Sequence, residues 1–222
     1  MRRLYIIVEG QTEAEFIESV LRPYLNEKGI FFVEPIIIHT SKGFKGGFVN
    51  FQHLFNDASK LLKQQSDIIV STFVDFFRVP TSLPDYDTCM KQSSVEAKIN
   101  CLEKAIAQSI NDRRFIPYIQ KHEFEALLYS SNRGFETYFD EGVFNRTQAI
   151  MDVYPNPEDI NDNPQTAPSK RLDNITQTVL KRKYDKVNDG NTIALEIGID
   201  AIIEKCPRFK AWVETLQTVV YQ

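Results

Sequence analysis

Cysteine is scarce in this chain, and its three copies are poorly placed to act together. Cys89, Cys101 and Cys206 are odd in number and widely scattered. They form no Cys-x-x-Cys pair, so neither a zinc knuckle nor a disulfide framework is indicated. We therefore expect three reduced thiols, as is usual for a cytoplasmic protein.

Long apolar runs and an excess of one charge are also missing. No stretch approaches the roughly 20 apolar residues of a membrane span, and the chain leads from Met1 directly into a predicted strand, which does not fit a signal peptide. The net charge of −4 gives no global reason to expect binding to nucleic acid or to a membrane. It does not exclude a local basic patch. These absences favour a cytoplasmic globular protein.

The first 130 residues contain an alternation of strand-like and helix-like segments. Short runs rich in β-branched and aromatic residues are followed by apolar residues at helical spacing. The predicted strands cover residues 3–8, 31–38, 67–75 and 114–120. Such alternation is typical of an α/β fold with a mostly parallel sheet flanked by helices.

Strand signals vanish after residue 130. A connector rich in Pro, Asn and Asp spans residues 153–168, and three helical patterns follow it, at 169–184, 191–205 and 208–219. We therefore predict an α/β domain over residues 1–130 and a helical extension over residues 131–222 that packs on it.

Two of the predicted strands end at an acidic residue. Glu9 follows the first strand, and Asp75 ends the third. Ligands of parallel α/β sheets bind beyond the carboxyl ends of the strands, so neighbouring strands would bring both carboxylates to one crevice. Carboxylate oxygens are the ligands that Mg²⁺ prefers. The pattern predicts a metal site, and the alternative is that each acid belongs to an ordinary turn or helix cap.

The motif "VEGQTE" at residues 8–13 and the "VD" at residues 74–75 resemble the Toprim fold of topoisomerases, primases and related nucleases. In that fold an acid after the first strand assists proton transfer at a phosphodiester, and an Asp-x-Asp pair after a later strand binds Mg²⁺. The resemblance makes Glu9, Glu13 and Asp75 catalytic candidates. It also makes Glu9 and Asp75 candidate ligands of Mg²⁺ or Mn²⁺.

A closer resemblance covers nearly the whole chain. It rests on the segments "VEGQTE", "VDFFRVP", "PYIQKHEFEALLYS", "INDNPQTAPSKRL" and "CPRFKAW". These are similar to the bacterial domain-of-unknown-function family 4276, which is Toprim-like and is often encoded beside ABC- or AAA-type ATPases. The resemblance implies a Toprim-like sheet and an ATPase partner, but no defined activity.

Position 77 departs from the Toprim pattern, because Phe77 stands where the second Asp of the pair would follow Asp75. We therefore expect weak metal binding, with Glu123 or Glu125 replacing the missing ligand. On an α-helix these two would flank the apolar side at about 100° each way, so only one could easily face the crevice. His122 is a candidate proton carrier or phosphate contact. The alternative is an exposed helix start.

A basic cluster lies in "TAPSKRL", residues 166–172. Ser169 indicates the start of a helix, which places Lys170 and Arg171 in a first turn where the helix dipole disfavours cations. That placement favours an anion bound at the helix N-terminus, and Lys186 extends the patch. We predict that these four residues bind phosphate or nucleic acid. A solvated helix face is the alternative.

Two functions of different classes fit these patterns. The first is a nuclease or related phosphodiester enzyme of a bacterial defence or DNA-repair module, acting on nucleic acid. A weakly bound Mg²⁺ or Mn²⁺ on Glu9, Asp75 and Glu123 or Glu125 would polarise the phosphate and generate the nucleophile. The second is a catalytically weak or inactive partner of a neighbouring ATPase, which Phe77 and the acidic net charge favour. The sequence predicts no oligomeric state.

Overall fold

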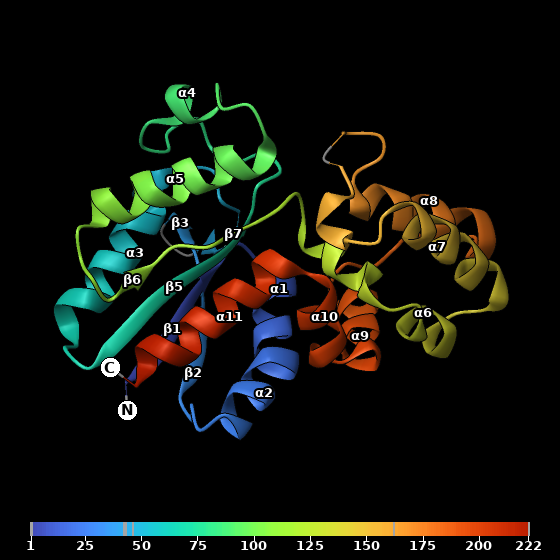
Figure 1. Ribbon diagram of the computed structural model, residues 1–222, viewed down its shortest axis with the longest axis horizontal. Coiled ribbons are helices and arrows are strands. Elements are labelled where there is room, and N and C mark those ends of the chain that lie inside the picture. The colour runs from blue at the N-terminus through green and yellow to red at the C-terminus, as the bar shows by residue number, and fades with distance from the viewer. Residues whose placement is uncertain (1, 42–43, 46, 162, 222) are drawn as a thin grey trace.

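A parallel sheet forms the centre of one half of the molecule, and a group of helices forms the other half (Figure 1). The computed structural model describes residues 2–41, 44–45, 47–161 and 163–221. All strand pairings of the main sheet are parallel. Its order is β2-β1-β5-β6, with β7 also on β5: β1 (Arg3–Val8), β2 (Val33–Ile37), β5 (Ile68–Asp75), β6 (Phe115–Ile116) and β7 (Ile119–Gln120). The predicted mostly parallel α/β sheet flanked by helices is confirmed.

The two central strands, β1 and β5, are buried on both faces, which explains their uninterrupted apolar sequences. Alternate residues serve two cores: Leu4 and Ile6 face one, and Tyr5 and Ile7 face the other. The register pairs Val8 with Phe73. Both strands therefore end close together, and the acids that follow them start from the same edge of the sheet.

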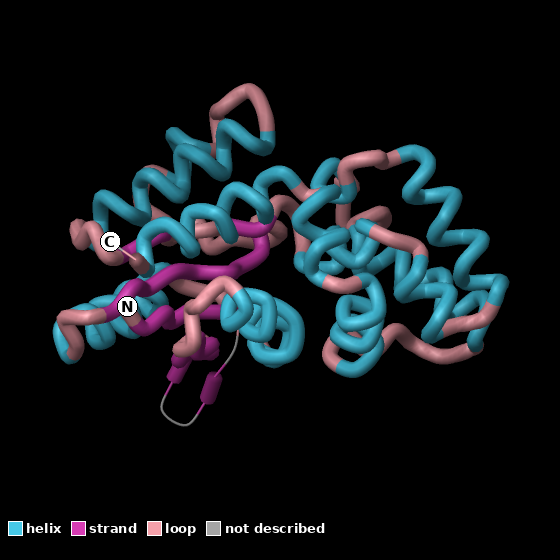
Figure 2. Tube along the Cα trace, turned by 60° about the horizontal axis from the view of Figure 1, so that its bottom comes forward, coloured by secondary structure: helices cyan, strands magenta, loops and turns pink. Residues whose placement is uncertain are grey.

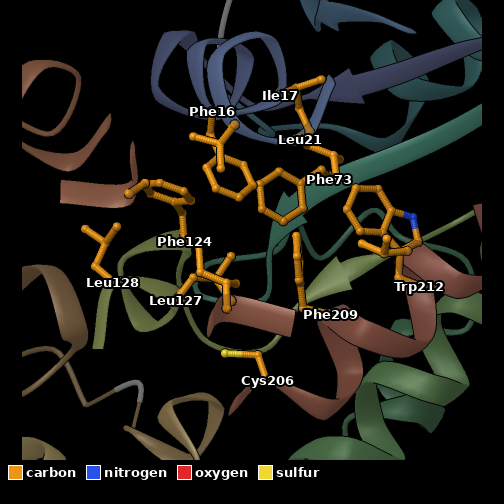
Figure 3. Close-up of a cluster of buried hydrophobic side chains, with 14 of the residues drawn as sticks. Phe16, Ile17, Leu21, Phe73, Phe124, Leu127, Leu128, Cys206, Phe209 and Trp212 are labelled. Atoms are coloured by element: carbon orange, nitrogen blue, oxygen red, sulfur yellow. The ribbon is translucent and has the colours of Figure 1, made fainter. Parts of the chain in front are cut away.

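Helices cover both faces of this sheet (Figure 2). One face carries α3 (Phe51–Gln64) and α5 (Val95–Ile110). The other carries α1 (Gln11–Phe16), a π-helical turn over Ile17–Leu21, α2 (Arg22–Glu27) and the last helix, α11 (Pro207–Val220). An aromatic cluster joins α1 and α11 to β5, with the ring of Trp212 stacked 5.4 Å from that of Phe73 (Figure 3).

The second half of the molecule is helical. It contains α6 (Arg133–Tyr138), α7 (Glu141–Val153), a short 3₁₀ helix (Pro157–Asp159), α8 (Pro168–Leu180), α9 (Asn188–Ile197) and α10 (Ile199–Lys205). From there α11 returns to the sheet, where Trp212 Nε1 donates to Ser71 Oγ at 2.9 Å. The division of the chain at residue 130 stays a prediction. In the described structure no helix has the length and apolarity to cross a bilayer.

Several local features differ from the sequence prediction. The fourth strand is split into β6 and β7, because Pro117 between them has no N–H to donate. The segment Phe124–Ser130 is a 3₁₀ helix instead of an α-helix. A small antiparallel pair, β3 (His39–Ser41) and β4 (Phe44–Lys45), follows β2 and was not predicted.

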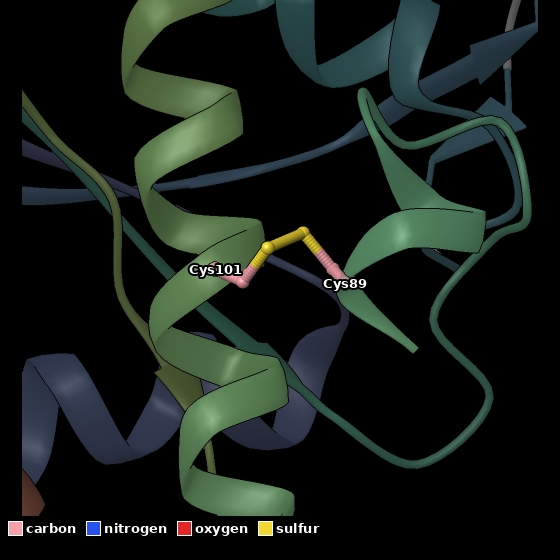
Figure 4. The surroundings of a disulfide bond; sticks show 2 residues. All are labelled: Cys89 and Cys101. Carbon is pink, nitrogen blue, oxygen red and sulfur yellow. A yellow bond between two sulfur atoms is a disulfide. The ribbon is translucent and has the colours of Figure 1, made fainter. Parts of the chain in front are cut away.

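The cysteine prediction was wrong for two of the three residues. Cys89 and Cys101 form a disulfide that ties the short helix α4 (Tyr86–Cys89) to α5 (Figure 4). Their Cα atoms lie 5.3 Å apart because α4 packs directly on α5, a contact that scattered positions in the sequence do not reveal. Cys206 is a buried free thiol.

Candidate active site: an acidic crevice beyond β1 and β5

Glu9 and Asp75 leave the carboxyl ends of neighbouring strands, as predicted, and both are partly buried. Asp75 Oδ1 accepts a hydrogen bond of 2.8 Å from the backbone N–H of Phe124. Burial raises the pKa of Asp75 well above its usual range, and Glu13 and Glu9 raise it further. Burial also raises the pKa of Glu9, while the backbone N–H groups of Phe48 and Asp75 oppose that rise.

Glu13 lies in the first turn of α1, and its side chain caps the N-terminus of that helix. Its Oε2 accepts from the backbone N–H of Gly10 at 2.9 Å. Burial raises the pKa of Glu13 from 4.5 to about 7, and the nearby charges of Glu9 and Glu125 contribute to the rise. The second acid of the "VEGQTE" motif is therefore both a helix cap and a member of the acidic group.

Glu123 is the anion found at the N-terminus of α8. Its Oε2 accepts from the backbone N–H of Ser169 and its Oε1 from the Ser169 hydroxyl, both at 3.0 Å. Glu123 is only 4% exposed. The helix start at Pro168 thus has the anion that its geometry favours, and that anion is a carboxylate of the chain itself.

Glu125 forms an ion pair with Lys186 from the segment before α9. Lys186 Nζ lies 2.9 Å from Glu125 Oε1, with the Glu125 side chain 1% exposed and the Lys186 side chain 51% exposed. Burial raises the pKa of Glu125 and the Lys186 charge opposes that rise. Desolvation would lower the pKa of Lys186, but Glu125, Glu123 and Asp75 outweigh it and the pKa is raised.

Both Glu123 and Glu125 lie close enough to Asp75 to raise its pKa. The expectation that only one of them could face the crevice assumed an α-helix. Glu123 is instead extended, with φ −138°, and precedes a 3₁₀ helix that contains Glu125. The structure therefore brings together five carboxylates, those of Glu9, Glu13, Asp75, Glu123 and Glu125, and we call this group the acidic crevice.

The other predicted phosphate contacts, His122, Lys170 and Arg171, do not belong to the group of five carboxylates. His122 is 4% exposed and its carbonyl accepts from the Phe77 N–H at 2.8 Å. Arg171 donates through Nε to the carbonyl of Thr166 at 2.7 Å, and Lys170 is exposed. Among the described residues, no hydrogen bond or ion pair joins Lys170 or Arg171 to the acidic crevice, and the side-chain bonds of Arg171 go to Thr166 and Tyr154. Their phosphate role stays a prediction.

Tyr184 is a member of this site that sequence reasoning missed. Within the described part of the chain its buried hydroxyl has no hydrogen-bond partner. Burial raises the pKa of Tyr184, and the charge of Glu125 adds to that effect. Its position two residues before Lys186 was the only signal in the sequence.

The carboxylate oxygens of the acidic crevice are of the chemical type that suits a hard divalent cation, although they are not arranged around a common point. Among the described residues, no three His, Cys, Asp or Glu side chains stand in position to hold a metal together. All donors are carboxylate oxygens, as Mg²⁺ and Mn²⁺ prefer. Glu125 Oε2 is buried and lacks a hydrogen-bond partner in the described structure. Of the five acids, Glu125 is ion-paired with Lys186, and the group carries more negative than positive charge when ionised.

The fold and the crevice define a class: a parallel α/β protein with an acidic site at the carboxyl ends of its central strands. The chain belongs to the family described as Domain of unknown function (DUF4276), which matches residues 8–217. This confirms the family resemblance seen in the sequence. No curated protein matches the chain.

Solved structures of the C-terminal region of the OLD protein from Xanthomonas campestris pv. campestris are similar to this chain. One has 14% sequence identity and a TM-score of 0.44, covering 100% of this chain and 97% of that chain. Another has 15% identity and a TM-score of 0.43, covering 100% and 98%.

Proposed function

We propose that this protein is a divalent-metal-dependent enzyme that cleaves phosphodiester bonds, a nuclease in type. The observation that carries the proposal is the gathering of five carboxylates beyond β1 and β5, one of which, Glu125, is ion-paired with Lys186. Buried carboxylates at such density raise one another's pKa, which is costly near neutral pH unless a cation neutralises them. A site whose ionised carboxylates are destabilised in this way is a candidate functional site.

Glu9, Asp75 and Glu125 are the proposed metal ligands. Glu125 is preferred to Glu123 because Glu125 Oε2 is without a hydrogen bond among the described residues, whereas both oxygens of Glu123 accept from Ser169. When bound, the metal would polarise the phosphate and lower the pKa of a water nucleophile. Glu123 would position the site by fixing α8 against it.

Glu13 is the proposed proton carrier. Its pKa of about 7 lies where a group can both accept and release a proton near neutral pH. The Oε2 atom is held by Gly10, so the carboxyl group keeps a fixed orientation next to Glu9 and Glu125.

The test is cleavage of single-stranded and duplex DNA and RNA with Mg²⁺ or Mn²⁺. Glu9→Gln and Asp75→Asn should each reduce cleavage by about 100-fold or more, as loss of a catalytic group does. Glu214→Gln is the matched control, because Glu214 is an exposed acid on α11. Cleavage that the two site variants leave intact would show that the activity lies elsewhere or comes from a contaminant.

Calorimetric titration with Mn²⁺ tests the metal separately from catalysis. Wild type should bind weakly, because Phe77 deprives the site of a carboxylate after Asp75, and Asp75→Asn should bind more weakly still. Glu214→Gln should behave as wild type. Equal binding by wild type and Asp75→Asn would exclude Asp75 as a ligand.

A second candidate function is that of a weakly active partner of an ATPase encoded beside it, in a defence or repair module. Two observations favour it: among the described residues no three carboxylates stand in position to hold a metal, and Glu125 is already paired with Lys186. The two candidates differ in one measurement. A chain that is inactive alone and cleaves nucleic acid, or alters ATP hydrolysis, only with that ATPase present would support the second.

A further inference from the structure

A second hollow opens on the loop that directly follows Asp75. It has a volume of about 490 Å³, within the range of small-molecule sites. One wall is the loop from Phe76 to Val79, a second is formed by Tyr86 and Met90, and the third by Asn161, Asn163 and Pro164. Because Phe77 follows Asp75 by two residues, the hollow begins within about 7 Å of chain from the acidic crevice.

The lining combines aromatic faces, a cation and amides. Phe77, Tyr86 and Met90 are partly buried, so each presents an apolar surface to the hollow. The guanidinium carbon of Arg78 lies 5.0 Å from the centre of the Phe77 ring. The guanidinium therefore lies over one face of the Phe77 ring, and a planar π-system joined to an anion can stack against this pair.

The two asparagines supply hydrogen-bond donors. Asn161 Oδ1 accepts from the Thr166 hydroxyl at 2.8 Å, and Asn163 Oδ1 accepts from the backbone N–H of Gln165 at 2.9 Å. These bonds orient the amides. In the described structure neither Nδ2 group donates to the protein, so both remain able to donate to the carbonyl or ring-nitrogen acceptors of a ligand.

The aromatic wall is held in place by the backbone. Phe76 N donates to Gln120 O at 2.9 Å and Phe77 N to His122 O at 2.8 Å, which extends the pairing of β5 past the end of the strand. Arg78 then adopts φ 64°, a conformation that costs a non-glycine residue energy. Backbone strain of this kind clusters at functional sites.

The opposite wall is fixed covalently. Tyr86 and Met90 sit at either end of α4, and the disulfide from Cys89 to Cys101 ties α4 to α5 (Figure 4). The disulfide therefore restrains the α4 wall before any ligand arrives. A preformed site loses less entropy on binding than one that must be assembled.

We propose that this hollow is a base-binding subsite that takes one unstacked nucleobase of a single-stranded nucleic acid, next to the phosphodiester held at the acidic crevice. The inference rests on the proposed function and deepens it. Phe77 stacks on the base, Arg78 pairs with the adjoining phosphate, and the asparagine amides contact the base edge. Where the Toprim pattern has a second metal ligand, this chain has a stacking surface.

The test is equilibrium binding of a fluorescently labelled single-stranded oligonucleotide, measured in EDTA so that neither metal nor cleavage takes part. Phe77→Leu keeps an apolar side chain and removes the π-face, and it should weaken binding by about 5- to 150-fold, the range for loss of one base–aromatic stack. Phe77→Tyr should restore wild-type affinity. Phe31→Ala is the control, because Phe31 is 69% exposed and does not line the hollow.

The outcomes separate the subsite from the proposed enzyme. Tight binding that depends on the Phe77 ring, in a protein that never cleaves, would support the subsite and refute the nuclease proposal. Metal-dependent cleavage with equal affinities for wild type, Phe77→Leu and Phe77→Tyr would refute the subsite alone. Absence of single-stranded binding by wild type, or equal loss with Phe31→Ala, would also overturn it. Thermal unfolding of each variant confirms that it is folded.

Discussion

At the scale of single residues, Glu13 makes stability depend on pH in an unusual direction. Its pKa in the folded protein is about 7, above its ordinary value of 4.5. Between these values the folded chain holds a proton that the unfolded chain has lost. The resulting stabilisation is fully present below pH 4.5 and is lost as pH rises through 7, a change of up to about 3 kcal/mol.

We therefore predict that, in EDTA, the free energy of unfolding falls between pH 5 and pH 8. Glu13→Gln should flatten this profile and stabilise the protein at pH 8, since glutamine cannot ionise and can still accept from the Gly10 N–H. Urea unfolding at the two pH values measures both effects. The exposed control Glu214→Gln should keep the wild-type slope. A slope for Glu13→Gln equal to that of Glu214→Gln would count against the shifted pKa of Glu13.

The sequence placed Glu9 and Asp75 correctly because strand ends are local features and neighbouring parallel strands share an edge. It could not place the partners of the other acids. Glu123 meets Ser169 across 46 positions, and Glu125 meets Lys186 across 61. Such contacts depend on how the helical half folds back over the sheet. The anion expected at the start of α8 was a phosphate, and the structure instead places Glu123 on Ser169 there, so the phosphate role of the basic cluster stays a prediction.

At the scale of elements, the disulfide is expected to contribute measurably to stability. Cys89 and Cys101 are 12 positions apart, and closing a loop of about that length stabilises a folded chain by roughly 3 kcal/mol. Reductant should lower the free energy of unfolding by that order in wild type and have no further effect on the Cys89→Ser/Cys101→Ser variant. Titration of the unreduced protein with a thiol reagent under denaturing conditions should find one free thiol, that of Cys206, and three would contradict the bond.

Element types were predictable where their sequence patterns were long. The 16-residue α5 and the 8-residue β5 show several repeats of their periods. The segment Phe124–Ser130 is buried at all seven positions, so no polar face reveals whether its period is 3.0 or 3.6 residues. Likewise the apolar residues on both sides of Pro117 read as one strand, although the proline divides them.

At the scale of the whole molecule, the last helix, α11, brings the end of the chain next to its beginning. The backbone N–H of Arg2 donates to the carbonyl of Val220 at 3.2 Å, and Trp212 stacks on Tyr118 with ring centres 4.6 Å apart. The sequence predicted a helix over residues 208–219, in an extension that packs on the α/β domain. It could not show that this helix covers the sheet, since α6 to α10 intervene and belong to the other half of the molecule (Figure 1).

A fragment of residues 1–130 is therefore predicted not to fold independently. It would expose the face of β5 that α11 covers, including Phe73, which is 1% exposed in the whole chain. In the full-length protein, Trp212→Ala should cost about 3–5 kcal/mol, the usual loss for a large buried aromatic, while Trp212→Phe should cost less because it keeps a ring on Phe73. Circular dichroism during urea unfolding measures the stability of the fragment and of the two Trp212 variants. A fragment of residues 1–130 that unfolds in one cooperative transition would instead make the α/β half an autonomous domain, with α11 as an accessory to it.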